Sequence, residues 1–517
     1  MVDPENTPFT LPATPERAQD MRRAARNISV LMLASVLSKG ILLVWQIVLG
    51  NWLGPTEYGL YNTVISLGAV AAPIVNFGIG LIAIREVSRK PELAGRYWTA
   101  MLFTQTLLFI VAYLVMVIAS VIVRGGAGSD EIVAFAAVSG ISLLIDVFGS
   151  ISNDLLIAQE RMTITAAVDV GTITLRVLLV ATVVSAGWGL AGIYLMTILV
   201  GILRFAVLWG VHFYNGLRPE WPLDRAITWG LLSNGWPLAI NALIAQMYDH
   251  SDKIMTTAII GETNTGYLSP AFLIKFGVVE LLSTTVVVAT YPIMSRYYEE
   301  GDGSMFGFMV EKMARFMLLV SLPIALVFTF FSGPIIMLIY SEEYAPVIGI
   351  MPIFMWYTVL TMVGSIFSRA LLIQNKQRIA LMIRIVGLVL NVILNLVLLV
   401  GYRDPRGAAI ATIVAESVSL VLMMRVFRAP GFSWGVVIGG ALRILGWGAA
   451  SAIVMVLLGS IHYIPGIAGG LLVYAAGCFW LPVLGRDDWD LVYRVVAAMP
   501  GGHIIRRYWH RDVAVNW

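Results

Sequence analysis

Several lysines lie inside stretches of this sequence that are otherwise apolar. Lys39 falls near the middle of the stretch 28–50, Lys253 falls in 230–259, and Lys275 falls in 266–292. A charge at the centre of a bilayer costs several kcal/mol, so it usually faces a cavity or a partner and marks a functional site. The lysine ammonium is a point charge with three donors, which suits an anionic phosphate group. We therefore predict that these three lysines bind an anion.

Acidic residues accompany the lysines in the same stretches. Asp249 and Asp252 precede Lys253, and Glu280 follows Lys275. Asp249 and Lys253 stand four residues apart, so they can meet on one helix face. This pair therefore has two interpretations, a substrate site or an internal salt bridge that holds helices together.

Two further carboxylates lie deep in apolar stretches, Asp146 in 132–157 and Glu416 in 407–425. Together with Asp249, Asp252 and Glu280 they are candidates for exchanging a proton or binding Na⁺ during transport, or else for structural pairing. Arg204 and Arg369 lie nearer the ends of their stretches and are expected to extend to the membrane interface.

The composition indicates a membrane protein. The chain has 517 residues, of which 59% are hydrophobic and only 13% are charged, whereas soluble domains carry about 25% charged residues. A helical span needs about 20 mostly apolar residues, and helices satisfy the backbone in lipid. The sequence predicts an all-α polytopic protein of about fourteen spans: 28–50, 58–80, 98–123, 132–157, 164–186, 189–212, 230–259, 266–292, 316–340, 347–373, 381–402, 407–425, 438–460 and 466–484.

The distribution of Lys and Arg predicts the orientation. Most of the 34 Lys and Arg residues fall in the two tails and in the loops on one side, while Arg124, Arg403 and Arg406 lie on the other side. Positive loops stay cytoplasmic. Both termini are therefore expected in the cytoplasm of a cell whose plasma or inner membrane holds the protein.

A repeated turn indicates an internal duplication. Gly54 and Gly59 flank Thr56, and the same spacing recurs 207 residues later as Gly261, Thr263 and Gly266. Each turn separates two long spans, so one helical hairpin has been used twice, as in parallel transporter repeats. We expect two six-helix lobes around a central cavity, followed by two extra helices. The expected segments are a tail 1–26, an N-lobe 27–214, a linker 215–228, a C-lobe 229–426, spans 13–14 in 427–484, and a tail 485–517.

Signals of enzymes and metal proteins are weak in this sequence. The expected external loops are short, and no P-loop, GxSxG, HExxH or EF-hand spacing occurs. The single Cys478 excludes an internal disulfide framework or a cysteine-rich metal site. We expect no catalytic residue, metal, cofactor or nucleic-acid partner.

Several motifs resemble those of the polysaccharide transport family, the oligosaccharide flippases of the multidrug/oligosaccharidyl-lipid/polysaccharide superfamily. They are Asn51–Tyr61 with the sequence NWLGPTEYGLY, Asn76–Gly80, Ile84–Glu86, the Asp249–Lys253 region with Gly261–Tyr267, and Tyr340–Tyr344. The resemblance extends over about residues 25–425. It implies a V-shaped pair of six-helix lobes that works by alternating access on an oligosaccharide carried by a polyprenyl (pyro)phosphate. Membrane lipids, and glycosyltransferases or a polymerase of the same pathway, would be its partners.

The resemblance makes Arg85 a further candidate for contact with the phosphate, at the cytoplasmic mouth. Ordinary positive-inside topology also accounts for this arginine. Two other functions remain open. One is an H⁺- or Na⁺-coupled exporter of drugs or cations from the same superfamily, because the spans contain acidic as well as basic residues. The other is a polysaccharide polymerase or ligase, against which the short external loops argue.

Overall fold

The structure, a computed structural model, describes residues 15–480. Side chains are described from Ser38 onward, apart from those at 280, 281, 284, 285, 288, 289, 479 and 480. Within this range all regular structure is helical, which confirms the predicted fold class. Residues 1–14 of the expected N-terminal tail, the end of the last span (481–484) and the expected tail 485–517 lie outside the described residues.

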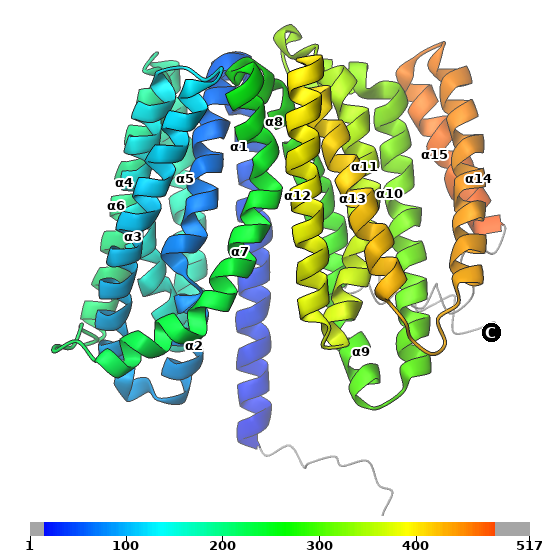
Figure 1. The fold of residues 1–517 in the computed structure, drawn as a ribbon. Helices are drawn as coiled ribbons and strands as arrows, with labels where there is room; N and C mark the ends of the chain where they lie inside the picture. Colours follow the sequence, from blue (N-terminus) through cyan, green and yellow to red (C-terminus); the bar gives the residue numbers. More distant parts are fainter. Residues whose placement is uncertain (1–14, 481–517) are drawn as a thin grey trace, which may run out of the picture.

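The first six predicted spans form one group of helices, shown in blue and cyan in Figure 1. Helix α1 contains both of the first two spans: it is kinked at Gly54 (φ 70°, ψ 171°), rises to the upper end of the molecule and then returns. The reversal therefore takes place with almost no loop. The elements are α1 (Pro15–Asn76), α2 (Ile79–Arg89), the 3₁₀ turn η1 (Pro91–Leu93), α3 (Ala94–Gly125), α4 (Glu131–Ala158), α5 (Met162–Ser185) and α6 (Gly189–Tyr214).

The second group holds the remaining predicted spans. The expected eighth span is interrupted by a short π-helical segment, η2, which separates α8 from α9. The elements are α7 (Arg225–Ile260), α8 (Glu262–Val278), η2 (Val279–Thr284), α9 (Thr285–Glu299), α10 (Gly303–Ile339), the 3₁₀ turn η3 (Glu342–Tyr344), α11 (Val347–Ile373), α12 (Gln377–Tyr402), α13 (Arg406–Val426), α14 (Trp434–Gly459) and α15 (Tyr463–Trp480).

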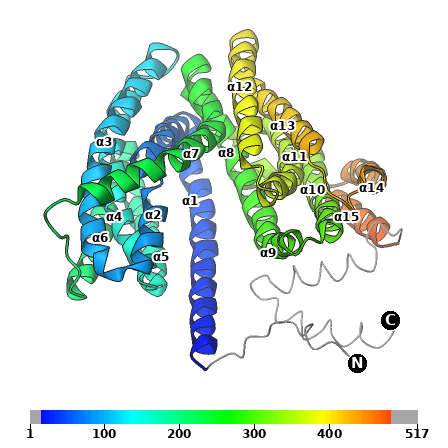
Figure 2. The ribbon, with the colours of Figure 1, turned by 60° about the horizontal axis from the view of Figure 1, so that its bottom comes forward.

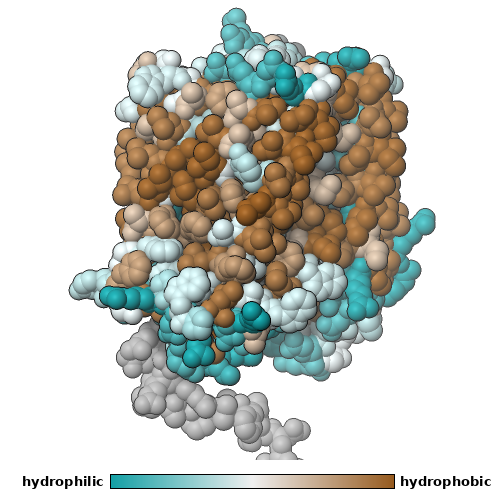
Figure 3. Space-filling model, turned by 60° about the vertical axis from the view of Figure 1, so that its left-hand side comes forward, coloured by the Kyte–Doolittle hydropathy of each residue, from teal (hydrophilic) through white to brown (hydrophobic). Residues whose placement is uncertain are grey.

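The outer surface is suited to a bilayer. Among the described residues, ten helices are long and apolar enough to cross a membrane. On the face seen in Figure 3, a broad hydrophobic band crosses the middle of the molecule, with hydrophilic residues gathered at both ends. A multi-pass membrane protein is thereby confirmed.

The apolar core is divided between the two groups of helices. One cluster of buried side chains lies almost wholly within α1–α6 and includes Trp98 and Ile151. Another lies in the second group around Phe367, and Ile444 of α14 packs with Leu322 of α10. A further cluster joins the two groups, because it packs Tyr58 of α1 with Leu268 of α8 and Phe354 of α11.

Helix α7 links the two groups. Asp224 caps its N-terminus, accepting hydrogen bonds from the backbone N–H groups of Ala226 (2.9 Å) and Ile227 (3.2 Å). Its first half crosses beneath the N-terminal group and its second half rises beside α12 (Figure 2). Proline at 237 lies inside the helix and removes one backbone donor at the bend.

Candidate functional site

The two repeated turns meet at the upper end of the molecule. A Cβ placed on Gly59 would lie 1.9 Å from the carbonyl oxygen of Glu262, and one on Gly266 would lie 1.8 Å from that of Pro55. These contacts are reciprocal between equivalent positions, as across a two-fold axis. The hydroxyls of Thr56 and Thr263, also equivalent, are hydrogen-bonded at 2.9 Å. The glycines are therefore required because backbone packs against backbone.

More hydrogen bonds join the two groups below this contact. The Thr63 hydroxyl lies 2.6 Å from that of Thr257, and His250 Nδ1 lies 3.0 Å from the Ser66 hydroxyl. At the rim, the Tyr344 hydroxyl donates to the Gly50 carbonyl (2.7 Å).

These bonds gather in one part of the molecule. Between the described residues 38–214 and 250–480, hydrogen bonds join 50–66 and 127–129 on one side to 250–263 and 339–344 on the other. The two groups are therefore sealed together in the upper half of the molecule.

Lys253 and Lys275 both lie near one aromatic ring, that of Phe272. The Lys253 ammonium is 5.1 Å from the centre of the Phe272 ring, and that of Lys275 is 5.8 Å from it. Lys275 also lies 4.9 Å from the centre of the Tyr357 ring. Rings within about 6 Å attract a cation. The two predicted lysines are thus brought together by α7 and α8.

Neither lysine forms an ion pair with a described carboxylate. Lys253 donates to Asn62 Oδ1 at 3.5 Å, which is a weak contact from α7 to α1. The predicted Asp249–Lys253 ion pair is not formed, and Asp249 is exposed. Asp249 and Asp252 act electrostatically on Lys253, and Asp249 and Glu416 act on Lys275. Two half-buried ammonium groups that form no ion pair with a described carboxylate leave positive charge available for an anion.

Asp252 is buried, only 1% exposed, in a polar network inside the second group. It accepts hydrogen bonds from Asn391 (3.0 Å) and Asn395 (2.6 Å) of α12 and from Thr412 of α13 (2.6 Å). The side-chain oxygen of Asn395 is buried without a partner. Lys253 and Lys275 act on this carboxylate electrostatically, but neither forms an ion pair with it. A buried carboxylate without an ion-pair partner is costly unless it is protonated or binds a cation.

The other predicted carboxylates are not part of this network. Glu416 accepts a 2.5 Å hydrogen bond from Tyr248, which joins α13 to α7. Asp146 is exposed on α4, within electrostatic range of Arg176 and Arg204. Glu280 lies in η2, but its side chain is not among those described.

Three further basic residues were considered. Lys39 is exposed on the first half of α1, a helix that touches α8 where Leu43 meets Gly277. Arg85 is exposed on α2 and pairs with Glu86 at 2.9 Å. Arg204, which was expected at the interface, is only 17% exposed and donates to Asp169 at 2.9 Å. This residue therefore forms an ion pair between α6 and α5.

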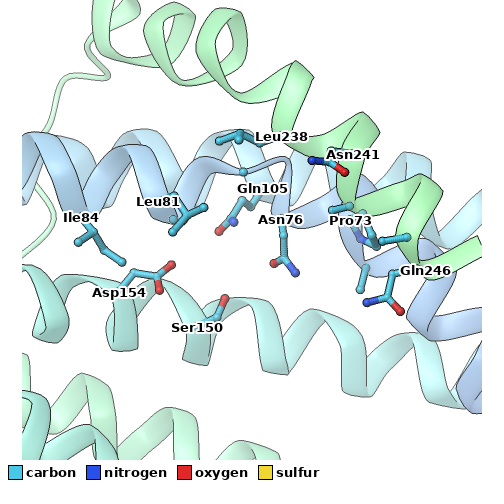
Figure 4. A pocket seen from close by; sticks show the side chains of 15 residues that line it. Pro73, Asn76, Leu81, Ile84, Gln105, Ser150, Asp154, Leu238, Asn241 and Gln246 are labelled. Atoms are coloured by element: carbon cyan, nitrogen blue, oxygen red, sulfur yellow. The ribbon is translucent and has the colours of Figure 1, made fainter. Parts of the chain in front are cut away.

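A cavity of about 620 Å³ opens where α1 breaks into α2, against α7 (Figure 4). Pro73, Gly78 and Leu238 form part of its wall, and a Cβ on Gly78 would lie 2.5 Å from that of Leu238. Its polar lining residues are Asn76, Gln105, Ser150, Asp154, Asn241 and Gln246. Of these only Asp154 is charged, so a scan of the sequence for charged residues in spans did not find the cavity.

Known structures share this fold. A lipid II flippase MurJ in an inward closed conformation matches with a TM-score of 0.69 at 15% identity, covering 86% of this chain and 97% of that one. A multidrug resistance MATE transporter in an inward-facing conformation matches with a TM-score of 0.60 at 17% identity, covering 76% and 93%. An outward-facing conformation of a transporter with the same description reaches only 0.50 at 17% identity, covering 77% and 94%. A search of the curated proteins found no match.

These likenesses show that the chain shares the fold of these proteins. The family model described as polysaccharide biosynthesis protein matches residues 24–298, more than half of the chain. The protein therefore belongs to that family. A second model, MatE, matches residues 237–397.

Proposed function

We propose that the protein is an alternating-access flippase that moves polyprenyl-(pyro)phosphate-linked oligosaccharide from the cytoplasmic to the outer leaflet for polysaccharide biosynthesis. The observation that carries this proposal is the pair formed by Lys253 and Lys275 around Phe272. Two cations that form no ion pair with a described carboxylate suit a pyrophosphate, whereas a site for a cationic drug would be acidic. Family membership supports a role in polysaccharide biosynthesis.

The direction of transport follows from the orientation proposed for the chain. With both termini in the cytoplasm of a plasma or inner membrane, the upper end in Figure 1 faces outward. The seal between Gly59 and Gly266 is then the closed outer gate, and the head group enters from the cytoplasm. The better match to inward-facing than to outward-facing relatives supports this state.

The exporter alternative draws support from the MatE match and from exposed Asp146 and Asp249. Proteoliposomes separate the two functions. If the protein is a flippase, a fluorescent polyprenyl-pyrophosphate oligosaccharide should move from one leaflet to the other. A cationic dye should not accumulate inside the vesicles. Dye transport without lipid translocation would overturn the flippase proposal.

Coupling to an ion is assigned to Asp252. Its buried carboxylate, the unpartnered oxygen of Asn395 and the Thr412 hydroxyl offer the oxygen atoms that Na⁺ would need, and a proton is the other candidate. The Asp252→Asn substitution keeps the shape but removes the charge. We expect about tenfold slower translocation and loss of its response to a Na⁺ or pH gradient.

The matched control for Asp252 is Glu416→Gln on α13, which changes a carboxylate bonded to one tyrosine. This variant should keep its response to the gradients. An Asp252→Asn protein that translocates at the wild-type rate, with the same gradient response, would leave the carboxylate a structural role only.

Arg85 is proposed to receive the head group at the cytoplasmic mouth. Because its side chain is exposed and already paired with Glu86, we expect a small effect. Arg85→Ala should reduce loading from the cytoplasmic side about threefold and leave loading from the other side unchanged. Vesicles in which lipid is added to one leaflet at a time measure the two rates, and an equal reduction in both would count against this role.

A further inference from the structure

The cavity between α1, α2, α4 and α7 is lined in a way that the lysine pair does not explain. Five of its polar residues, Asn76, Gln105, Asp154, Asn241 and Gln246, form no side-chain hydrogen bond with any described residue. Polar groups at this depth of a membrane protein are costly unless they line water or a ligand. These five residues therefore line water or a ligand.

Gln105 is the strongest sign that the cavity holds a ligand. Its side chain on α3 is only 1% exposed, and its carbonyl oxygen has no hydrogen-bond partner. An unsatisfied buried acceptor costs about 1–3 kcal/mol. In Figure 4 the Gln105 side chain lies in the cavity wall among Asn76, Leu81 and Asn241. A donor from a bound molecule would remove this cost.

The residues that line the cavity indicate which class of ligand it binds. Amide groups both donate and accept hydrogen bonds, as sugar hydroxyls do. Leu81, Ile84 and Leu238 provide apolar surface, and no Lys, Arg or His lines the cavity. Its volume of about 620 Å³ is within the usual range for ligand pockets. The single ionisable lining residue is Asp154, whose carboxylate repels acidic groups in its ionised form.

The position of the cavity relates it to the lysine pair. Asn241 and Gln246 line it from α7, and Lys253 follows seven residues after Gln246 on the same helix. Seven residues of α-helix rise about 10 Å. One molecule can therefore place a phosphate at Lys253 and its adjoining groups in the cavity.

We propose that this cavity is a subsite for neutral sugar residues, which binds the first sugars of the cargo while the lysines bind its phosphate. The inference rests on the proposed flippase function for the cargo, but the subsite is defined by its own residues. It makes the protein selective: neutral oligosaccharides fit, and sugars that carry a carboxylate beside Asp154 are rejected.

Two probes test the subsite separately from the proposed function. A free neutral tetrasaccharide, without lipid or phosphate, is measured by saturation-transfer NMR on the purified full-length protein, and polyprenyl pyrophosphate without sugar is measured by native mass spectrometry. We expect Gln105→Leu and Asn241→Leu to weaken the tetrasaccharide about tenfold and to leave the pyrophosphate lipid unchanged. Lys253→Gln with Lys275→Gln should show the reverse pattern.

Control variants show which of the two proposed sites a negative result would overturn. Asn234→Leu is matched because Asn234 is also exposed on α7 but bonds to the Gly230 carbonyl outside the cavity, so its binding should equal that of wild type. Asn241 is exposed, so its substitution tests the subsite even where Gln105→Leu fails to fold. Unchanged tetrasaccharide binding in Asn241→Leu overturns the subsite. Unchanged pyrophosphate binding in the double lysine variant overturns the lysine site alone.

Asp154 provides the test of selectivity. A tetrasaccharide with one uronic acid should bind wild type about tenfold more weakly than the neutral one, and Asp154→Asn should remove most of this difference. Equal binding of the two sugars to the wild-type protein would overturn the assigned selectivity.

Discussion

Replacing Lys253 and Lys275 together by glutamine should abolish translocation of a lipid-linked oligosaccharide, with a rate at least about 100-fold below wild type. Both ammonium groups lie beside Phe272 without a described carboxylate within ion-pair distance. Losing a buried charge contact costs about 2–5 kcal/mol, and each 1.4 kcal/mol is a factor of ten. Single substitutions should each lose part of this effect. The rate is measured in proteoliposomes with a fluorescent polyprenyl-pyrophosphate oligosaccharide.

Two control variants show whether a loss of translocation comes from the loss of these two charges. Lys253→Arg with Lys275→Arg keeps both charges and should retain much of the activity. Arg296→Gln with Arg378→Gln removes two exposed cations from the same half of the chain, which controls for net charge, and should translocate at the wild-type rate. A wild-type rate in the double glutamine variant, with the protein correctly inserted, would remove the lysines from the site.

The repeat could be predicted from the sequence in more detail than most of the site. Gly54 with Gly59 and Gly261 with Gly266 indicated a duplicated hairpin, and in the structure the two turns pack reciprocally. The sequence could not show that they touch each other, because spacing reports similarity and not proximity. The absence of a loop at Gly54 was missed for a related reason: both sides of a positive-φ glycine are apolar and helical.

The lysine pair was predictable because charges in apolar spans are rare and expensive. A charge in a span does not show which side chain of a neighbouring helix lies beside it. The sequence offered Asp249 as the partner of Lys253 at helical spacing, but the structure instead places the ring of Phe272 beside that lysine. An aromatic residue in a span gives no sign of its own that it contacts a cation.

Neutral polar residues carried the parts of the site that sequence reasoning missed. Asn391 and Asn395, four residues apart in an apolar span, surround Asp252 together with Thr412. Their helical spacing could have indicated that both face one site. No such pattern marks Gln105 and Asn241, because a single amide in a membrane helix is common. These two residues come together only because of the break between α1 and α2.

Cross-linking the two turns should stop transport almost completely. The hydroxyls of Thr56 and Thr263 are 2.9 Å apart across the seal, so cysteines at these positions can reach disulfide geometry. Cys478 is the only native cysteine, and it is buried on α15. Oxidation of Thr56→Cys with Thr263→Cys should therefore form one specific bond. If transport requires the outer gate to open, the oxidised protein should translocate lipid at least about 100-fold more slowly, and reduction should restore the rate.

The covalent bond separates the gate from a merely structural contact. Each single cysteine variant should transport normally under both oxidising and reducing conditions, since it loses one weak surface hydrogen bond. The reduced double variant controls for the substitutions themselves. Because the bond holds the two helical groups together at the upper end only, head-group binding from the cytoplasmic side should persist while release to the outer leaflet is lost. A fully cross-linked protein that still releases lipid outward would mean that Gly59 and Gly266 do not separate during transport, and the gate would have to lie elsewhere.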